Sequence, residues 1–384
     1  MARGALHVVQ IGFFLDPEER VPAQLLRDWW PLVDTAEMVA RSGARVTVIQ
    51  ACKRSETVIR AGVTYHFLAR DRDAPTLAGG GDFMRLMSRL RADVIHVHGL
   101  GFPEEILALS QAAPTIPILL QDHADGVPRF WRRRVHHQAM ARVSGVAFCA
   151  LDQAKPFQRV GLLKRHSALF EIPECSSRFL PGDRQTARVL TGLHGDPAVL
   201  WVGHLDSNKD PLTVLAAIGE ASQQLPNLQL FCCFGKAPLL REVEQQVARD
   251  PRLPGRVHLL GKVPHERIET LMRAADVFVL GSHHEGSGCS LIEALACGLP
   301  PIVTAIPSFR ALTINGEVGA LWCCDDPADL SRALIAIGTR PYREMRGDVR
   351  AHFDRELSFD AVGRKLLSAY VNLSHAPPMV GASE

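Results

Sequence analysis

Two short stretches in the second half of the chain combine residue types that bind phosphate groups and sugar hydroxyls. The first runs from Gly203 and His204 to Lys209, between an apolar run that predicts a strand and Pro211, a residue typical of a first helical position. A lysine in front of a helix adds a full positive charge to the partial positive charge of the helix start. This pattern favours a bound phosphate, and a surface lysine beside a turn is the ordinary alternative.

The second stretch runs from Asp276 to Pro300 and places a polar, glycine-bearing loop between a predicted strand and a predicted helix. Glycines let the backbone approach a ligand, and the free N–H groups of the helix start suit a phosphate. Glu285 and Glu293 both offer carboxylates to sugar hydroxyls. Spacing alone favours a plainer interpretation of Glu293, because Ser290 and Glu293 also form a capping-box pattern.

Taken together, the two stretches resemble the retaining, nucleotide-sugar-dependent family-four glycosyltransferases, which have the GT-B fold of two Rossmann-like domains. The matching positions in the second half are Gly203, His204, Lys209, Glu285, Glu293 and residues 294–300. The first half is similar to the family at residues 93–99 and at residues 118–124, which include His123. The C-terminal segment from Phe353 onward resembles the closing part of such enzymes.

The resemblance implies roles for the matching residues. The lysine matching Lys209 binds the diphosphate of the sugar donor, and the acid matching Glu293 holds the ribose hydroxyls. The expected catalytic residues are Glu285, which contacts the transferred sugar, and His123, which reaches the donor sugar from the N-terminal domain. The expected donor-binding residues are Gly203, His204, Lys209, Val263, Ser287, Gly288, Cys289, Ser290 and Glu293.

The resemblance also implies the reaction. A metal-independent glycosyltransferase of the hexosyltransferase type is expected to move a sugar, with retention, from a UDP-sugar or GDP-sugar to a hydroxyl acceptor in glycan biosynthesis. Cations and helix-end amides stabilise the charge that grows on the leaving diphosphate, so no metal, cofactor or protein nucleophile is expected. A glycan, a lipid-linked glycan and a small molecule all stay open as acceptors.

Departures from the family pattern support an alternative, a non-catalytic or weakly active sugar-nucleotide-binding protein of the same fold. His204 stands where the family has an arginine, and a neutral histidine holds diphosphate less well than a guanidinium. Residues 15–22 replace the usual glycine-rich turn after the first strand, and residues 306–310 replace a Gly-Gly turn. A nicotinamide-dependent oxidoreductase is disfavoured, because no G-x-G-x-x-G follows the first strand.

Two series of alternating strands and helices must position these residues. Apolar runs predict strands in the first half at residues 6–13, 45–51, 63–68, 93–98, 116–121, 146–150 and 168–172. In the second half they predict strands at residues 198–202, 228–234, 256–260, 276–280, 301–304 and 319–323. Strands that are apolar almost throughout and separated by helices indicate parallel sheets covered on both faces. The predicted fold class is therefore α/β, with two Rossmann-like parallel-sheet domains facing a central cleft and a C-terminal helix returning towards the N-terminal domain.

Turn-rich segments set the predicted domain bounds. Residues 1–182 are predicted to form an N-terminal, acceptor-side domain, and residues 197–355 a nucleotide-sugar-binding domain. Residues 183–196 are predicted to link them, residues 356–375 to form the crossing helix, and residues 376–384 to be a frayed tail.

Composition restricts the partners and the compartment. The 384 residues include 43 basic and 41 acidic side chains, a balance that argues against a general nucleic-acid binder. The nine cysteines form no C-x-x-C pair, so buried, reduced thiols in a cytoplasmic protein are expected. Neither a signal peptide nor a run of about 20 apolar residues is evident, so no spanning helix is expected.

A basic segment from Arg129 to His137 leaves a peripheral membrane contact open. It predicts a helix with Trp131, Val135 and Ala139 on one face, and such a helix can rest on an anionic surface such as the inner face of a membrane. An ordinary packed helix with a solvated basic face is the somewhat favoured alternative.

Other clusters of possible metal ligands are interpreted as non-metal. Asp71-Arg72-Asp73 is expected to be a solvated loop rather than a metal-binding pair. His96 and His98 are expected to point to opposite faces of a strand, and the run 283–285 has too little spacing for a helical metal site.

Overall fold

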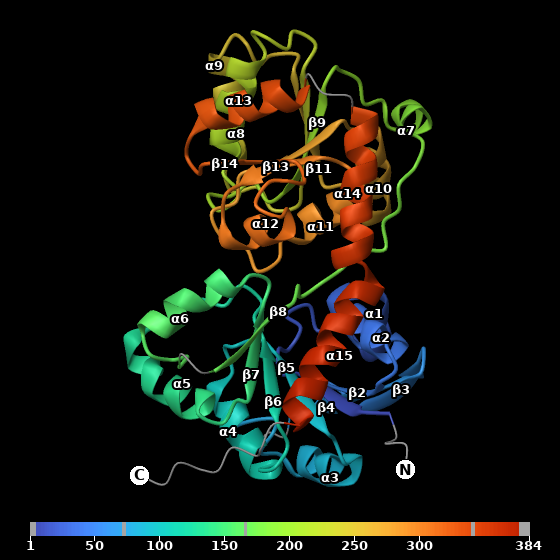
Figure 1. The fold of residues 1–384 in the computed structure, drawn as a ribbon, viewed down its shortest axis with the longest axis vertical. Helices are drawn as coiled ribbons and strands as arrows, with labels where there is room; N and C mark the ends of the chain where they lie inside the picture. Colours follow the sequence, from blue (N-terminus) through green and yellow to red (C-terminus); the bar gives the residue numbers. More distant parts are fainter. Residues whose placement is uncertain (1–4, 71–73, 165–166, 339–341, 376–384) are drawn as a thin grey trace. The chain divides into compact units, whose positions relative to one another are not determined.

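The computed structural model describes residues 5–70, 74–164, 167–338 and 342–375 and divides the chain into two compact units (Figure 1). Unit 1 comprises residues 1–175 and 359–384, and unit 2 comprises residues 176–358.

Unit 1 is built on a sheet with the strand order β3-β4-β2-β1-β5-β6-β7-β8. All neighbouring strands are parallel except the edge pair β3 and β4. The strands are β1 (His7–Gly12), β2 (Arg45–Cys52), β3 (Glu56–Arg60), β4 (Val63–Ala69), β5 (Val94–His98), β6 (Ile118–Gln121), β7 (Gly145–Phe148) and β8 (Ala168–Glu171). The helices are α1 (Pro22–Asp28), α2 (Trp30–Arg41), α3 (Gly81–Leu90), α4 (Pro103–Ala112), α5 (Arg133–Met140), α6 (Lys155–Arg159) and α15 (Phe359–His375).

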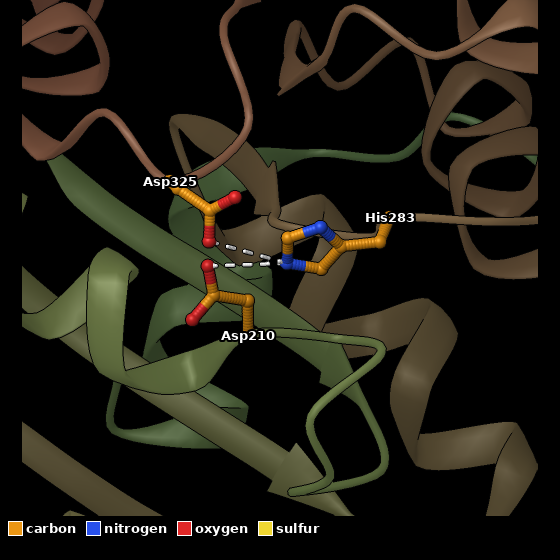
Figure 2. A group of neighbouring side chains, drawn as sticks. All are labelled: Asp210, His283 and Asp325. Atoms are coloured by element: carbon orange, nitrogen blue, oxygen red, sulfur yellow. Dashed lines mark ion pairs between the residues drawn. The ribbon is translucent and has the colours of Figure 1, made fainter.

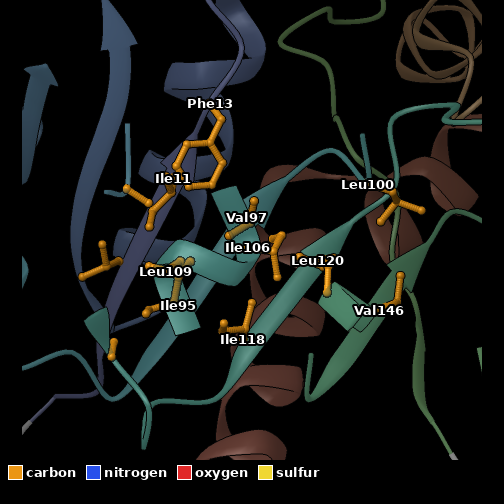
Figure 3. Packing of buried hydrophobic residues seen from close by; sticks show 14 of the residues in the cluster. Ile11, Phe13, Ile95, Val97, Leu100, Ile106, Leu109, Ile118, Leu120 and Val146 are labelled. Atoms are coloured by element: carbon orange, nitrogen blue, oxygen red, sulfur yellow. The ribbon is translucent and has the colours of Figure 1, made fainter. Parts of the chain in front are cut away.

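Both faces of this sheet are buried, as a continuous apolar run requires. Val9 and Ile11 of β1 belong to one core cluster, which Figure 3 shows from close by, whereas Val8 belongs to the cluster on the opposite face. The second cluster includes Val362 and Tyr370 of α15, which packs beside α2. The last long helix of the chain is therefore part of unit 1.

Unit 2 is built on a wholly parallel sheet with the strand order β11-β10-β9-β12-β13-β14. The strands are β9 (Ala198–Gly203), β10 (Gln229–Phe234), β11 (Val257–Gly261), β12 (Val277–Leu280), β13 (Pro301–Thr304) and β14 (Ala320–Trp322). The helices are α7 (Arg184–Thr191), α8 (Pro211–Ala221), α9 (Leu240–Arg249), α10 (His265–Ala274), α11 (Cys289–Ala296), α12 (Pro307–Leu312), α13 (Pro327–Gly338) and α14 (Tyr342–Glu356). Two parallel-sheet α/β domains and a C-terminal helix confirm the predicted fold class.

The domain division differs from the predicted one at both boundaries. Unit 2 runs from Ser176 to Ser358, whereas the predicted second domain ran from residue 197 to residue 355 and the predicted first domain ended at residue 182. The segment 183–196, predicted to be a linker, contains α7, which packs against α10. The helix forms because the Asp183 side chain caps its first turn, accepting the N–H of Thr186 at 2.8 Å.

Strand β3 has no counterpart in the sequence analysis. It lies at the sheet edge, and none of its residues is buried; Ile59 is 74% exposed. An exposed edge strand shows no apolar alternation, so its sequence carries little signal. Among the described residues, no helix is both long and apolar enough to cross a membrane.

Candidate functional site

Lys209 and Glu285 meet at the carboxyl edge of the unit 2 sheet, where parallel strands of an α/β fold bind ligands. Lys209 follows β9 and Glu285 follows β12, the neighbouring strand. The Lys209 ammonium forms an ion pair with Glu285 Oε1, and the Ser282 hydroxyl donates to the same oxygen at 2.7 Å. Both charged side chains are largely buried, 15% and 13% exposed. The structure thus brings together two side chains predicted from separate stretches.

The backbone around Lys209 is fixed by short-range hydrogen bonds. The Asp206 carboxylate accepts the Lys209 N–H at 3.0 Å, and the Asp210 carboxylate caps α8 by accepting the Thr213 N–H at 3.2 Å. Gly281 permits the close approach of the second loop, because a Cβ atom there would lie 3.0 Å from the Lys209 carbonyl oxygen. The loops after β9 and β12 therefore pack backbone to backbone.

The start of α11 follows the Glu285 loop directly. Gly288 is the N-cap residue, with φ of 79°, and as a glycine it brings no side chain to the cap. Ser287 is fully buried, whereas Cys289, the first helical residue, is exposed. The first backbone N–H groups of α11 carry the partial positive charge of the helix start.

Glu293 is not part of a capping box, contrary to the plainer interpretation of its spacing. The helix begins at Cys289, so Ser290 lies inside it rather than at its cap. Glu293 Oε1 instead contacts His265 Nε2 at 2.7 Å. This hydrogen bond to the carboxylate raises the pKa of His265. The His265 ring also lies 4.9 Å from the Phe179 ring, between centroids.

Nothing in the sequence indicated that His265 belongs to the site, because a helix and a strand separate it from Glu293 along the chain. Val263 lies just before it, in the loop after β11. Gly203 ends β9, and His204 is exposed and accepts the Lys236 N–H at 3.2 Å through Nδ1. His204 thus closes a turn with the strand end of β10.

In unit 1, His123 lies between a carboxylate and a second histidine. It follows β6, and its Nδ1 contacts Glu174 at 2.5 Å while its Nε2 contacts His98 Nδ1 at 3.1 Å. Burial alone lowers the pKa of His123, but the hydrogen bond and charge of Glu174, with the charges of Asp125 and Asp122, raise it above the usual value. Glu174 was not predicted, because it lies far from His123 in sequence.

Asp122 precedes His123 and is almost fully buried. Burial, together with the nearby charge of Asp125, raises the pKa of Asp122 to about 7. The carboxylates of Asp122, Asp125 and Glu174 therefore all influence the protonation of this part of unit 1.

The prediction that His96 and His98 point to opposite faces of the strand is wrong. Their ring centroids lie only 4.4 Å apart. Residues two positions apart in a strand share a face, whereas adjacent residues alternate. His96 Nδ1 contacts the Tyr370 hydroxyl at 2.7 Å, and burial lowers the pKa of His96 to about 3, so the imidazole is neutral.

A third histidine group lies in unit 2 (Figure 2). His283 Nε2 is 3.5 Å from Asp210 Oδ2 and 3.8 Å from Asp325 Oδ1. Asp210 and Asp325 are remote from His283 in sequence, so the run 283–285 alone gave no indication of this group. Within the described part of the chain, these three residues are the one group of histidine, cysteine and acidic side chains close enough to share an ion.

The basic segment of unit 1 is only partly a helix. A 3₁₀ turn at Phe130–Arg132 precedes α5, so Trp131 does not share a helical face with Val135 and Ala139. Ala139 is buried, whereas Phe130 and Trp131 are 74% and 60% exposed.

The segments that depart from the family pattern are also ordered. Asp16 in the first loop accepts two hydrogen bonds from the Arg20 guanidinium, which lower the pKa of Asp16 to about 2. Residues 306–310 form the N-cap and first turn of α12, whose Ser308 hydroxyl donates to the Glu285 carbonyl at 3.4 Å. Asp71-Arg72-Asp73 lies outside the described residues.

Comparisons with known proteins show what this chain is similar to. A family model described as "Glycosyl transferases group 1" matches residues 183–351. D-inositol 3-phosphate glycosyltransferase of Rhodococcus erythropolis strain PR4 is 31% identical over 202 residues, which cover 50% of this chain and 46% of that protein. 2-Deoxystreptamine N-acetyl-D-glucosaminyltransferase of Niallia circulans is 26% identical over 304 residues, 73% of this chain and 75% of that protein.

The chain spans about half the length of the D-inositol 3-phosphate glycosyltransferases that it matches, 46% and 47% in two cases. Among solved structures, sucrose-phosphate synthase of Thermosynechococcus elongatus superposes with a TM-score of 0.71 at 20% identity, covering 96% of this chain and 99% of that one. At that identity the likeness shows the fold alone.

Proposed function

We propose that this relative of the group 1 glycosyl transferases, a chain with their GT-B fold, transfers a sugar from a nucleoside-diphosphate sugar to a hydroxyl acceptor with retention. The observation that carries the proposal is the largely buried Lys209–Glu285 pair at the carboxyl edge of the unit 2 sheet, whose Glu285 lies in the loop that leads into the start of α11. An ammonium has three donors, so Lys209 can pair with Glu285 and still donate to a phosphate oxygen.

The proposed roles follow from the chemistry of each group. Lys209 and the first N–H groups of α11 stabilise the negative charge that grows on the departing diphosphate. Glu285 and Glu293 accept hydrogen bonds from hydroxyls of the sugar and of the ribose. The bond from the anomeric carbon to the phosphate oxygen breaks, the acceptor oxygen bonds to that carbon on the same face, and its proton passes to the leaving phosphate oxygen. No metal and no protein nucleophile enters this scheme.

His123 is the proposed catalytic residue of unit 1. Its contact with Glu174 raises its pKa, so both ring nitrogens keep their protons over a wider pH range. In the proposed role, a hydroxyl of the donor sugar replaces His98 as the acceptor of the Nε2 proton.

Calorimetry with UDP, GDP and their common sugars tests the donor site. Wild-type protein is expected to bind at least one of them, and Lys209→Ala and Glu293→Ala are each expected to abolish that binding. Lys164→Ala, which removes an exposed lysine of unit 1, is the control and should bind as wild type. Unchanged affinity in both donor-site variants would remove the basis of the site.

A second candidate function is binding of the sugar nucleotide without turnover. It is favoured by His204, whose ring closes a turn and offers no permanent charge to a diphosphate. Release of UDP or GDP from the bound donor across a panel of hydroxyl acceptors supports transfer. Tight donor binding without any such release supports the second candidate. In an active protein, an anomeric configuration of the product equal to that of the donor tests retention.

We further propose that residues 129–137 touch an anionic membrane surface. The exposed aromatic pair Phe130 and Trp131 lies beside Arg129, whose guanidinium is 5.4 Å from the Trp131 ring, a combination suited to the interface of a bilayer. Vesicles with anionic lipid are expected to retain wild-type protein and to release Trp131→Ser. Trp30→Ser, at a 45% exposed tryptophan of α2, is the control. Equal retention on neutral and anionic vesicles contradicts the proposal.

A further inference from the structure

We propose that Asp210, His283 and Asp325 form a binding site for one divalent transition-metal ion in unit 2. The three residues come from the loops after β9, β12 and β14, so they meet at the carboxyl edge of one sheet. Figure 2 shows His283 Nε2 directed between the two carboxylates. The inference does not depend on the proposed sugar transfer, and no step of that reaction passes through the ion.

The separations fit a shared ion better than direct hydrogen bonds. His283 Nε2 lies 3.5 Å from Asp210 Oδ2 and 3.8 Å from Asp325 Oδ1, both longer than an ordinary N–H···O bond. All three ligand atoms lie within 4.8 Å of one another. Two ligands bound at about 2.1 Å with tetrahedral geometry are about 3.4 Å apart. A small closure of the loops therefore brings all three atoms into bonding distance.

Asp210 supplies the second observation. Its Oδ1 accepts the Thr213 N–H, but its Oδ2 is screened from solvent and accepts no hydrogen bond from the described residues. A buried carboxylate oxygen without a donor costs free energy that a bound cation removes. This oxygen is the one that faces His283.

The two loops nearest the site are fixed to each other by hydrogen bonds through Asn208. The His283 N–H donates to the Asn208 carbonyl at 2.8 Å. The His284 N–H donates to Asn208 Oδ1 at 3.0 Å, and the Asn208 side-chain amide donates to the His284 carbonyl at 3.0 Å. The backbone that carries the His283 imidazole is therefore joined to the loop that carries Asp210 before any ion binds.

The donor set indicates the kind of ion. One imidazole nitrogen and two carboxylate oxygens suit Mn²⁺ or Zn²⁺, whereas Mg²⁺ prefers oxygen ligands alone. Asp325 is 78% exposed and His283 35%, so water completes the coordination. An ion here would join three loops and stabilise unit 2 by mass action.

Mn²⁺ is the better probe, because the chain carries nine cysteines whose thiols compete for Zn²⁺. Full-length protein freed of metal with EDTA is titrated with MnCl₂ and monitored by electron paramagnetic resonance. The expected result is one bound ion per chain and a higher melting temperature with Mn²⁺. His283→Ala and Asp325→Asn are each expected to weaken binding at least tenfold and to remove the thermal shift.

His284→Ala is the matched control, since it removes the adjacent exposed histidine and leaves the three ligands in place; its affinity for Mn²⁺ should equal that of wild type. Asp325→Asn changes an exposed side chain, so it keeps the test valid if His283→Ala fails to fold. Absence of bound Mn²⁺ in wild type, or wild-type affinity in Asp325→Asn, overturns the proposal.

Discussion

At the scale of single residues, the candidate side chains are held in pairs by partners of opposite or complementary character. Lys209 pairs with Glu285, Glu293 with His265, and His123 with Glu174. In every pair the two residues come from different elements. A side chain fixed before a ligand arrives loses less conformational entropy on binding, which favours precise recognition.

Glu174→Gln is expected to lower the pKa of His123. The carboxylate accepts a hydrogen bond from the ring and favours its charged form, and an amide keeps the shape without the charge. Histidine NMR titration measures the change directly. Glu171→Gln, at the exposed end of β8, is the control and should leave the titration of His123 unaltered.

The same pair predicts a pH dependence of stability. A histidine whose folded pKa is raised adds stability below its unfolded pKa of about 6.5 and loses it as the pH rises through the folded pKa. Glu174→Gln should therefore destabilise unit 1 more at a pH of about 6 than at about 9, as measured by urea unfolding. Asp122 and Asp125 also raise the pKa of His123, and His98 contacts its ring. Equal destabilisation at both pH values would contradict the charged state assigned to His123.

The Lys209–Glu285 pair is expected to contribute to stability. A double-mutant cycle with Lys209→Met and Glu285→Gln should give a coupling energy between about 0.5 and 3 kcal/mol, because both side chains are largely buried. The Lys155–Asp152 pair of unit 1 has side chains 57% and 59% exposed, and its cycle should give at most about 1 kcal/mol. Equal coupling in the two cycles would contradict the interpretation.

The sequence allowed both members of the Lys209–Glu285 pair to be predicted, and one member of each of the other two pairs. Lys209, Glu285, Glu293 and His123 lie in patterns with local spacing that resembles a known family. His265 and Glu174 lie in no such pattern, because their partners come close only after the strands pair. The same limit explains why Asp210 and Asp325 were not connected with His283.

At the scale of elements, the entry into α11 decides the shape of the candidate phosphate site. Gly288 has a φ of 79°, and a Cβ atom there would lie 2.6 Å from the Phe309 ring. Gly288→Ala is therefore expected to lower the free energy of unfolding by about 1–3 kcal/mol because of the left-handed backbone, and by a further amount because the ring must move.

Gly255→Ala measures the backbone contribution by itself. Gly255 has nearly the same φ of 77°, but nothing lies within 4 Å of an added Cβ, so only the left-handed backbone destabilises this variant. Chemical denaturation of both variants should show a larger loss for Gly288→Ala, by about 1 kcal/mol or more. A loss of stability no larger than that of Gly255→Ala would mean that the Phe309 ring moves aside without destabilising the protein.

Helix α7 is expected to depend on Asp276, which precedes β12. This carboxylate is fully buried, pairs with Arg188 at 2.7 Å and with Arg184 at 2.6 Å, and accepts the Ala198 N–H. Asp276→Ala should cost about 3 kcal/mol, the lower end of the range for breaking a buried pair, because both arginines keep some access to solvent. Asp183→Ala, which removes only the exposed cap of α7, should cost about 1 kcal/mol. Urea unfolding measures both, and equal costs would contradict the ranking.

Most elements could be predicted from apolar runs, because strands buried on both faces are almost continuously apolar. β13 illustrates this, since Pro301–Thr304 is buried at every position. Two elements were not predicted. The side chains of β3 face solvent, and the charged, turn-forming residues at the start of α7 are also typical of a linker. Tertiary contacts, here the arginines on Asp276, fix such segments.

At the scale of the whole molecule, the chain comprises two α/β units, each with polar groups at the carboxyl edge of its sheet. Unit 2 contains the Lys209–Glu285 pair, the start of α11 and the Glu293–His265 pair. We propose that these elements bind the nucleoside diphosphate.

Hydrogen–deuterium exchange with and without saturating UDP or GDP locates the bound nucleotide. We expect one of the two nucleotides to slow exchange in residues 204–210, 262–265 and 281–293, and Lys209→Ala to abolish this protection. Protection confined to other segments, or no protection by either nucleotide at concentrations that saturate related enzymes, would contradict the proposal.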